Sequence, residues 1–208
     1  MKKIINFLLI IIGLLFASCT TSNQNYPVTE LEYSDYVEVI KRADWGWLSL
    51  EKGKTEAKIK HITIHHGGVE FTADRSPTEA IRDLQKWSRA EKDWIDIPYH
   101  FMIDLNGNIY EARPINYPGD TNTEYDPTGH ALIEIMGNYE IQKFSEVQQK
   151  SLVNIIAFLV KEFSIPLAEI KTHKDYSAIT ACPGKDVYRY FQDSSIVKRV
   201  ETFLHENE

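Results

Sequence analysis

Residues 59–68 read Ile-Lys-His-Ile-Thr-Ile-His-His-Gly-Gly. From His61 onward, polar and branched apolar residues alternate, which is the period-2 pattern of a β-strand, and the two glycines mark its end. Because successive side chains of a strand point to opposite faces, His65 shares one face with His61 and Thr63, whereas His66 points the other way. The stretch therefore predicts a strand that presents one imidazole at its end, just before a glycine turn.

The segments on both sides of this strand predict an alternation of helices and strands. Asn106-Gly107 is a strong hairpin signal between two short strands. Ser145, with Gln148 three residues later, is the capping pattern of a long helix. The mixture indicates an α/β domain in which helices cover a central sheet. The expected helices are 77–94, 145–163 and 187–204, and the further expected strands are 99–104, 108–111, 131–136 and 170–173.

The first residues predict export. Lys2 and Lys3 precede an apolar run at 4–16, whose 13 residues are of signal-peptide length and too short to span a bilayer. Small residues stand immediately before Cys19, as in a bacterial lipobox, in which the cysteine is acylated; an ordinary signal peptide with an incidental cysteine is the alternative. The expected organisation is a signal peptide at 1–18, lipidated Cys19 with a flexible polar tether at 19–36, and one domain at 37–208.

Composition limits the classes of function. The chain has 208 residues, enough for one domain with a short extension, and a formal net charge of −7 with acidic residues spread along it. The sequence has no stripe of basic residues of the kind that would predict nucleic-acid binding. The acidity itself indicates solubility and nothing more specific.

Three residues are candidates for a metal site: His65, His173 and Cys182. If Cys19 carries lipid, Cys182 has no partner within the chain, and an unpaired cysteine in an exported protein needs a reason, of which metal ligation is one. Two imidazoles and a thiolate suit zinc, and three protein ligands leave a fourth position open for water. The alternatives are a hydrogen-bonded core histidine and a buried cysteine that only fills space.

Five blocks in a fixed order resemble the N-acetylmuramoyl-L-alanine amidase family, which includes peptidoglycan recognition proteins and phage lysozyme-like amidases. The resemblance implies a single α/β domain with a central mixed β-sheet flanked by helices. It also implies that His65, the first histidine of its pair, binds zinc with His173 and Cys182. His66 then supports the ligands from beside them or packs, and His100 is structural. The matching blocks are 42–46, 62–67, 94–101, 106–113 and, together, 173–175 with 182–184.

The same resemblance implies three catalytic residues. Tyr99 matches the tyrosine that the family places beside the zinc, where a phenol can donate to an oxyanion; a core aromatic is the alternative. Thr180, two residues before Cys182, can hydrogen-bond the same oxygen or the water. Glu134 interrupts an apolar strand, and some branches of the family place a general base there; a buried structural ion pair is the alternative.

The expected activity is hydrolysis of the amide bond between the muramic acid lactyl group and L-alanine of peptidoglycan. The expected cofactor is Zn²⁺, and the expected partners are peptidoglycan or muropeptides and, through the lipid, a membrane that faces the periplasm or cell wall. Two alternatives are a peptidoglycan-binding lipoprotein without catalysis and a lipoprotein whose zinc is only structural. The residues do not indicate an oligomeric state, or a preference between polymer and fragments.

Overall fold

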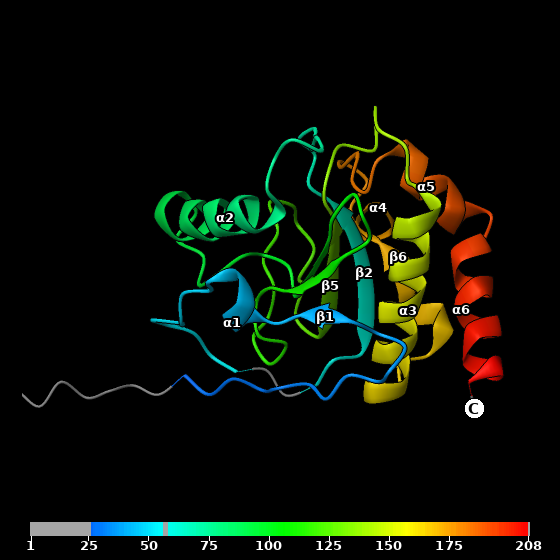
Figure 1. Ribbon diagram of the computed structural model, residues 1–208, viewed down its shortest axis with the longest axis horizontal. Helices are drawn as coiled ribbons and strands as arrows, with labels where there is room; N and C mark the ends of the chain where they lie inside the picture. Colours follow the sequence, from blue (N-terminus) through cyan, green and yellow to red (C-terminus); the bar gives the residue numbers. More distant parts are fainter. Residues whose placement is uncertain (1–25, 56–57, 208) are drawn as a thin grey trace, which may run out of the picture.

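The computed structural model describes residues 26–55 and 58–207, so the signal peptide expected at 1–18 and the lipidated Cys19 lie outside the described residues. Its centre is a six-stranded sheet in the order β1-β4-β3-β5-β2-β6 (Figure 1). The pair β3–β4 is antiparallel and the other pairs are parallel, so the sheet is mixed as expected. The strands are β1 (Val39–Ile40), β2 (His61–His66), β3 (Phe101–Ile103), β4 (Ile109–Glu111), β5 (His130–Ile135) and β6 (Ile170–Thr172).

Helices cover both faces of this sheet, with α2 on one side and α3 and α6 on the other (Figure 1). The larger apolar cluster joins the isoleucines of β2 and β5 to α3 and α6, and a smaller one joins α2 to Met102 and Tyr110. The fold is therefore a three-layer α/β domain. The helices are α1 (Arg42–Trp45), α2 (Pro77–Glu91), α3 (Glu146–Phe163), α4 (His173–Tyr176), α5 (Lys185–Gln192) and α6 (Ser195–Glu206), with a 3₁₀ turn at Leu167–Glu169.

The predicted alternation of side chains between the two faces of strand β2 is confirmed. In the parallel pair β2–β5, His65 lies opposite Glu134 and Ile64 lies opposite Ile133. Ile64 and Ile133 are fully buried in the larger cluster. His65 and Glu134 therefore share the opposite face, the one that α2 covers in part.

The Asn-Gly hairpin joins β3 to β4 as predicted. Gly107 has φ +80°, which a glycine adopts without strain. A Cβ there would lie 2.7 Å from Ser151 Oγ on α3, so the turn has no room for a side chain. The carboxylate of Asp104 accepts hydrogen bonds from the backbone N–H groups of Asn106 and Asn108, at 2.9 Å each, and closes the turn.

The two long helices expected in the second half have different outcomes. Helix α3 begins at the predicted place, and Ser145 and Gln148 form the full capping box. The helix expected at 187–204 was wrong as a single helix, because the chain there forms α5 and α6 with a break between them. Ser194 has φ +61°, a left-handed conformation that cannot continue an α-helix, and the two amphipathic helices change direction at this residue.

The prediction of a flexible tether up to residue 36 needs correction for residues 26–36, the part of it that the structure describes. Leu31 is 4% exposed and packs in the larger apolar cluster. Asn116 accepts from the backbone N–H of Thr29 at 3.0 Å and donates to the backbone oxygen of Pro27 at 2.8 Å, and Tyr33 donates to Glu111. Apolar and hydrogen-bonding residues spaced among the polar ones hold this segment on the domain. Among the described residues, none of the helices has the length and apolarity needed to cross a membrane.

Candidate metal centre

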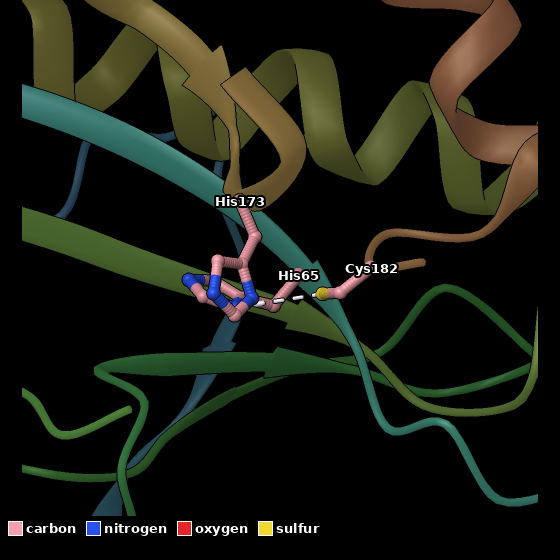
Figure 2. Close-up of side chains that lie close together, drawn as sticks. All are labelled: His65, His173 and Cys182. Carbon is pink, nitrogen blue, oxygen red and sulfur yellow. Dashed lines mark hydrogen bonds between the residues drawn. The ribbon is translucent and has the colours of Figure 1, made fainter. Parts of the chain in front are cut away.

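The three predicted ligands meet at the carboxyl ends of two adjacent parallel strands. His65 stands near the end of β2, and His173 directly follows β6, which pairs with β2. Cys182 comes from the loop between α4 and α5. One ligand atom from each of the three side chains lies within 4.8 Å of the others. Figure 2 shows the three side chains pointing toward one another. Cys182 Sγ lies 3.6 Å from His65 Nδ1.

The chemistry of this donor set fits zinc. Two imidazole nitrogens and one sulfur are the borderline-soft donors that zinc prefers over magnesium or calcium. His65, His173 and Cys182 are all buried. They also line a cavity of about 240 Å³, so a fourth side of the cluster faces open space. The residues present therefore supply three ligands and leave room for a water or substrate oxygen.

The three side chains are uncharged at neutral pH in the absence of metal. Burial lowers the pKa of His65 well below its usual value, and the neighbouring His173 lowers it further. Burial also lowers the pKa of His173 to about 4. The same cause raises the pKa of the Cys182 thiol to about 12, against a hydrogen bond that Sγ accepts from the backbone N–H of His66. Both imidazoles thus have a lone pair available to a cation, and the thiol must lose its proton to bind one.

A loop between β4 and β5 reaches both imidazoles, and sequence reasoning missed it. Tyr125 Oη lies 3.2 Å from His65 Nε2, and Thr123 Oγ1 lies 2.7 Å from His173 Nε2. Thr121 Oγ1 lies 3.4 Å from the same nitrogen of His173. These residues stand in a polar stretch with neither a strand nor a helix pattern, so no sequence signal placed them beside the histidines.

The predicted catalytic residues Tyr99 and Thr180 line the same cavity as the ligands. The ring of Tyr99 lies 5.2 Å from the ring of His65, centroid to centroid. Burial raises the pKa of this phenol, with Glu134 and Cys182 adding to the effect, so its proton is available for donation. Thr180 Oγ1 accepts from the backbone N–H of Cys182 at 3.1 Å, which leaves its own proton free.

Glu134 is the third predicted catalytic residue, and it lies beside the ligands rather than among them. It is opposite His65 in the sheet and lines a second cavity of about 270 Å³, next to Met102 and Trp87. An added Cβ at Gly67 would lie 2.5 Å from Glu134 Oε1, so this glycine makes room for the carboxyl group.

The structure also limits the alternative role of Glu134. Its Oε2 atom has no hydrogen-bond partner, and no ion pair to it forms among the residues that the structure describes. Burial alone raises its pKa to about 8. A buried structural ion pair is therefore not what holds this carboxyl group in the strand.

The two remaining histidines of the motifs, His66 and His100, both make hydrogen bonds to the backbone. His100 is buried, accepts from the backbone N–H of Leu132 at Nδ1, and lies 2.8 Å from the backbone oxygen of Tyr117 at Nε2, so both ring nitrogens are used. His66 Nδ1 accepts from the backbone N–H of Tyr139 at 3.2 Å, and the residue lines the same cavity as the three ligands.

Comparison with known proteins shows the family and the fold. Residues 55–185 match the family described as N-acetylmuramoyl-L-alanine amidase. Peptidoglycan recognition protein 1 of Rattus norvegicus is 27% identical over 158 residues, which cover 74% of this chain and 85% of the relative. A variant of Drosophila PGRP-LB, solved in complex with tracheal cytotoxin, is similar at a TM-score of 0.63 with 24% identity, covering 71% of this chain and 89% of that one.

A bacterial structure shares the fold as well. The N-acetylmuramoyl-L-alanine amidase LysC from Clostridium intestinale has a TM-score of 0.59 and 21% identity, and the match covers 72% of this chain and 90% of that one. The matched segment 55–185 is more than half of this chain and contains all three residues of the metal cluster. The chain therefore belongs to the N-acetylmuramoyl-L-alanine amidase family, with peptidoglycan recognition proteins among its relatives.

Proposed function

We propose that this protein is a zinc-dependent N-acetylmuramoyl-L-alanine amidase. The observation that carries the proposal is the convergence of His65, His173 and Cys182 beside a cavity, because a purely structural zinc site is closed by four protein ligands. Zinc at such a site supplies Lewis-acid polarisation of a carbonyl and activation of water. The bond cleaved is the amide between the lactyl group of muramic acid and L-alanine.

The side chains around the cluster divide the remaining chemistry. The phenol of Tyr99 and the hydroxyl of Thr180 line the cavity, and neither donates a hydrogen bond to another described residue, so both can donate to the oxyanion that develops on the amide carbonyl. The pKa of Glu134, about 8, is close to neutral pH, which suits a group that takes a proton from water and returns it to the leaving amine.

The substrate class is supported by the relatives. The family description names the amidase reaction, and the related proteins are named for recognition of peptidoglycan. A structural neighbour holds tracheal cytotoxin, which another neighbour's description calls a monomeric diaminopimelic acid-type peptidoglycan. We therefore propose peptidoglycan or a muropeptide as the substrate, bound across the cavity beside the cluster.

A digest of purified peptidoglycan tests this proposal. We expect released peptides with a free L-alanine amino terminus, detected by mass spectrometry, and we expect a chelator to abolish release and added zinc to restore it. Retention of the protein on peptidoglycan without any release would instead identify a non-catalytic binding lipoprotein. A cut elsewhere in the polymer would contradict the assigned bond, and release that a chelator leaves unchanged would contradict the role of the metal.

We also propose that the protein is a membrane-anchored lipoprotein that faces the periplasm or cell wall. This rests on the sequence around Cys19, in which small residues at the end of an apolar run precede a cysteine. Replacement Cys19→Ser should abolish incorporation of labelled palmitate and release the protein from the membrane fraction. Labelling that persists in the variant would disprove acylation at this residue.

A further inference from the structure

The loop between β4 and β5 contacts each of the two histidine ligands at Nε2. Tyr125 Oη is 3.2 Å from this nitrogen in His65, and Thr123 Oγ1 is 2.7 Å from it in His173. The other nitrogen of His65, Nδ1, is the one that faces Cys182 Sγ at 3.6 Å. Hydroxyl groups of a single loop thus lie beside the same ring nitrogen, Nε2, in both imidazoles. In His65 this nitrogen is not the one that faces the sulfur of Cys182.

The position of the proton on each imidazole ring determines which of its nitrogens can bind a metal. A neutral imidazole has one N–H group and one lone pair, and only the nitrogen with the lone pair can bind a metal. A hydroxyl oxygen can accept the N–H group of either nitrogen. If the proton is on Nε2 and is donated to the hydroxyl, Nδ1 presents its lone pair to the cluster. If it is on Nδ1, it blocks the side of His65 that faces Cys182.

We propose that Thr123 and Tyr125 are positioning residues that hold the proton of His173 and His65 on Nε2 and so orient both Nδ1 atoms toward the metal. This inference rests on the proposed zinc site. Metal-binding histidines ordinarily donate their second ring N–H to a carboxylate, a backbone oxygen or water, and the partner fixes the ring. In this chain two loop hydroxyls take that place.

The loop itself is held in position by contacts of its own. Thr121 Oγ1 lies 2.9 Å from Thr123 Oγ1 and accepts from the backbone N–H of Thr123 at 3.2 Å. The ring of Tyr125 stacks on the ring of Tyr176, with centroids 5.3 Å apart and planes within 19°. Contacts with neighbouring side chains therefore help to place both hydroxyl groups beside the imidazoles.

The protonated nitrogen can be observed directly in the zinc-free full-length protein. Two-bond ¹H–¹⁵N spectra distinguish a protonated ring nitrogen from one with a lone pair, and variants His65→Gln and His173→Gln assign the signals. We expect a protonated Nε2 in both rings. A protonated Nδ1 in either ring would overturn the proposal for that ring, whether or not the protein is an active amidase.

Zinc affinity provides a second readout, measured by competition with a chromophoric chelator. Tyr125→Phe and the double variant Thr121→Val with Thr123→Val remove the hydroxyls and keep the shape of the side chains. We expect each to weaken zinc binding by about 10–100-fold, the usual effect of losing such a partner. The Thr123→Ser variant, which keeps the hydroxyl that valine lacks, should bind zinc as the wild type does.

Tyr176→Phe is the matched control, because it keeps the ring that stacks on Tyr125, and among the described residues the Tyr176 hydroxyl makes no hydrogen bond to His65 or His173. It should leave zinc affinity unchanged, and the thermal midpoint of each zinc-free variant reports whether it is folded. Wild-type affinity in folded hydroxyl-free variants would refute the positioning role alone. A wild-type protein that binds no zinc would refute the proposed function itself.

Discussion

The half-buried ring of Tyr99 lies 5.2 Å from the imidazole of His65, centroid to centroid, and lines the cavity beside the metal cluster. Tyr99→Phe removes one proton donor and keeps the ring that packs there. Because loss of a single oxyanion donor costs about 10²–10³ in kcat, we expect turnover to fall by about that factor. Bound zinc, measured by plasma emission, should stay at the wild-type level. Loss of zinc in this variant, or unchanged turnover, would show that the phenol has a different role.

The carboxyl group of Glu134 predicts an unusual dependence of stability on pH in the zinc-free protein. Burial raises its pKa from an ordinary 4.5 to about 8, so the folded state favours the protonated form. Its stabilising contribution is full below pH 4.5 and is lost as the pH rises toward 8, because the unfolded chain ionises first. The loss is at most about 1.4 kcal/mol per pH unit.

Glu134→Gln removes this titration and keeps the shape of the side chain. We therefore expect the free energy of unfolding of the variant, relative to wild type, to increase between pH 5 and pH 8 in urea titrations. The difference between the two proteins cancels the titration of all other groups. A difference that is constant across this range would mean that the carboxyl group is ionised and has a partner in the folded protein.

At the scale of single residues, the sequence predicted the side chains that stand in motifs. His65, His173 and Cys182 were predicted together because the resemblance linked three distant positions, and the strand alternation supported His65 independently. Thr123 and Tyr125 could not be predicted in this way, since a polar loop has no period and its path depends on tertiary contacts. The cavity that Glu134 lines was equally out of reach, because packing between α2 and the sheet forms it.

At the scale of elements, helix α3 offers a test of local encoding. The Ser145 hydroxyl accepts from the backbone N–H of Gln148, and the Gln148 side chain accepts from the backbone N–H of Ser145. We expect Ser145→Ala to lower the free energy of unfolding by about 1 kcal/mol, measured by urea denaturation. Ser49→Ala, at an exposed serine outside any helix, should have no measurable effect. Equal effects of the two changes would rule out a contribution from the cap.

The elements that the sequence predicted well are those with strong local signals. The Asn106-Gly107 hairpin and the Ser145 cap are each decided within about four residues, and both are where the sequence predicted them. The division of the last helix into α5 and α6 was missed because amphipathic spacing continues on both sides of the break. Ser194 adopts a left-handed conformation there, and a serine in the sequence does not predict that conformation.

At the scale of the whole molecule, the segment at 27–36 belongs to the folded domain. Leu31 is buried in the main apolar cluster, far along the chain from most of its neighbours there. We expect Leu31→Ala to lower the free energy of unfolding by about 2–5 kcal/mol, as buried leucines do. The exposed neighbour Glu32, replaced by Ala, is the matched control. Both variants would behave like wild type in urea titrations if this segment were a loose tether.

The general architecture was predictable because hydrophobic pattern and turn residues agree with the resemblance along most of the chain. The boundary of the domain was not, since Thr29, Glu30 and Asp35 have the composition of a linker. The boundary is decided by the burial of a few apolar side chains such as Leu31, and the average composition of the segment does not reveal them. The order of the strands likewise depends on contacts between distant segments, which no local pattern specifies.

The position of the first described residues bears on how the molecule would face its substrate. Thr29 lines a cavity with Lys58 and Ile59, just before the start of β2, whereas His65 lies near the other end of that strand. If Cys19 carries the proposed lipid, the chain reaches the domain near the end of β2 that lies away from the metal cluster. The proposed attachment point and the cavity at the cluster then lie at opposite ends of this strand.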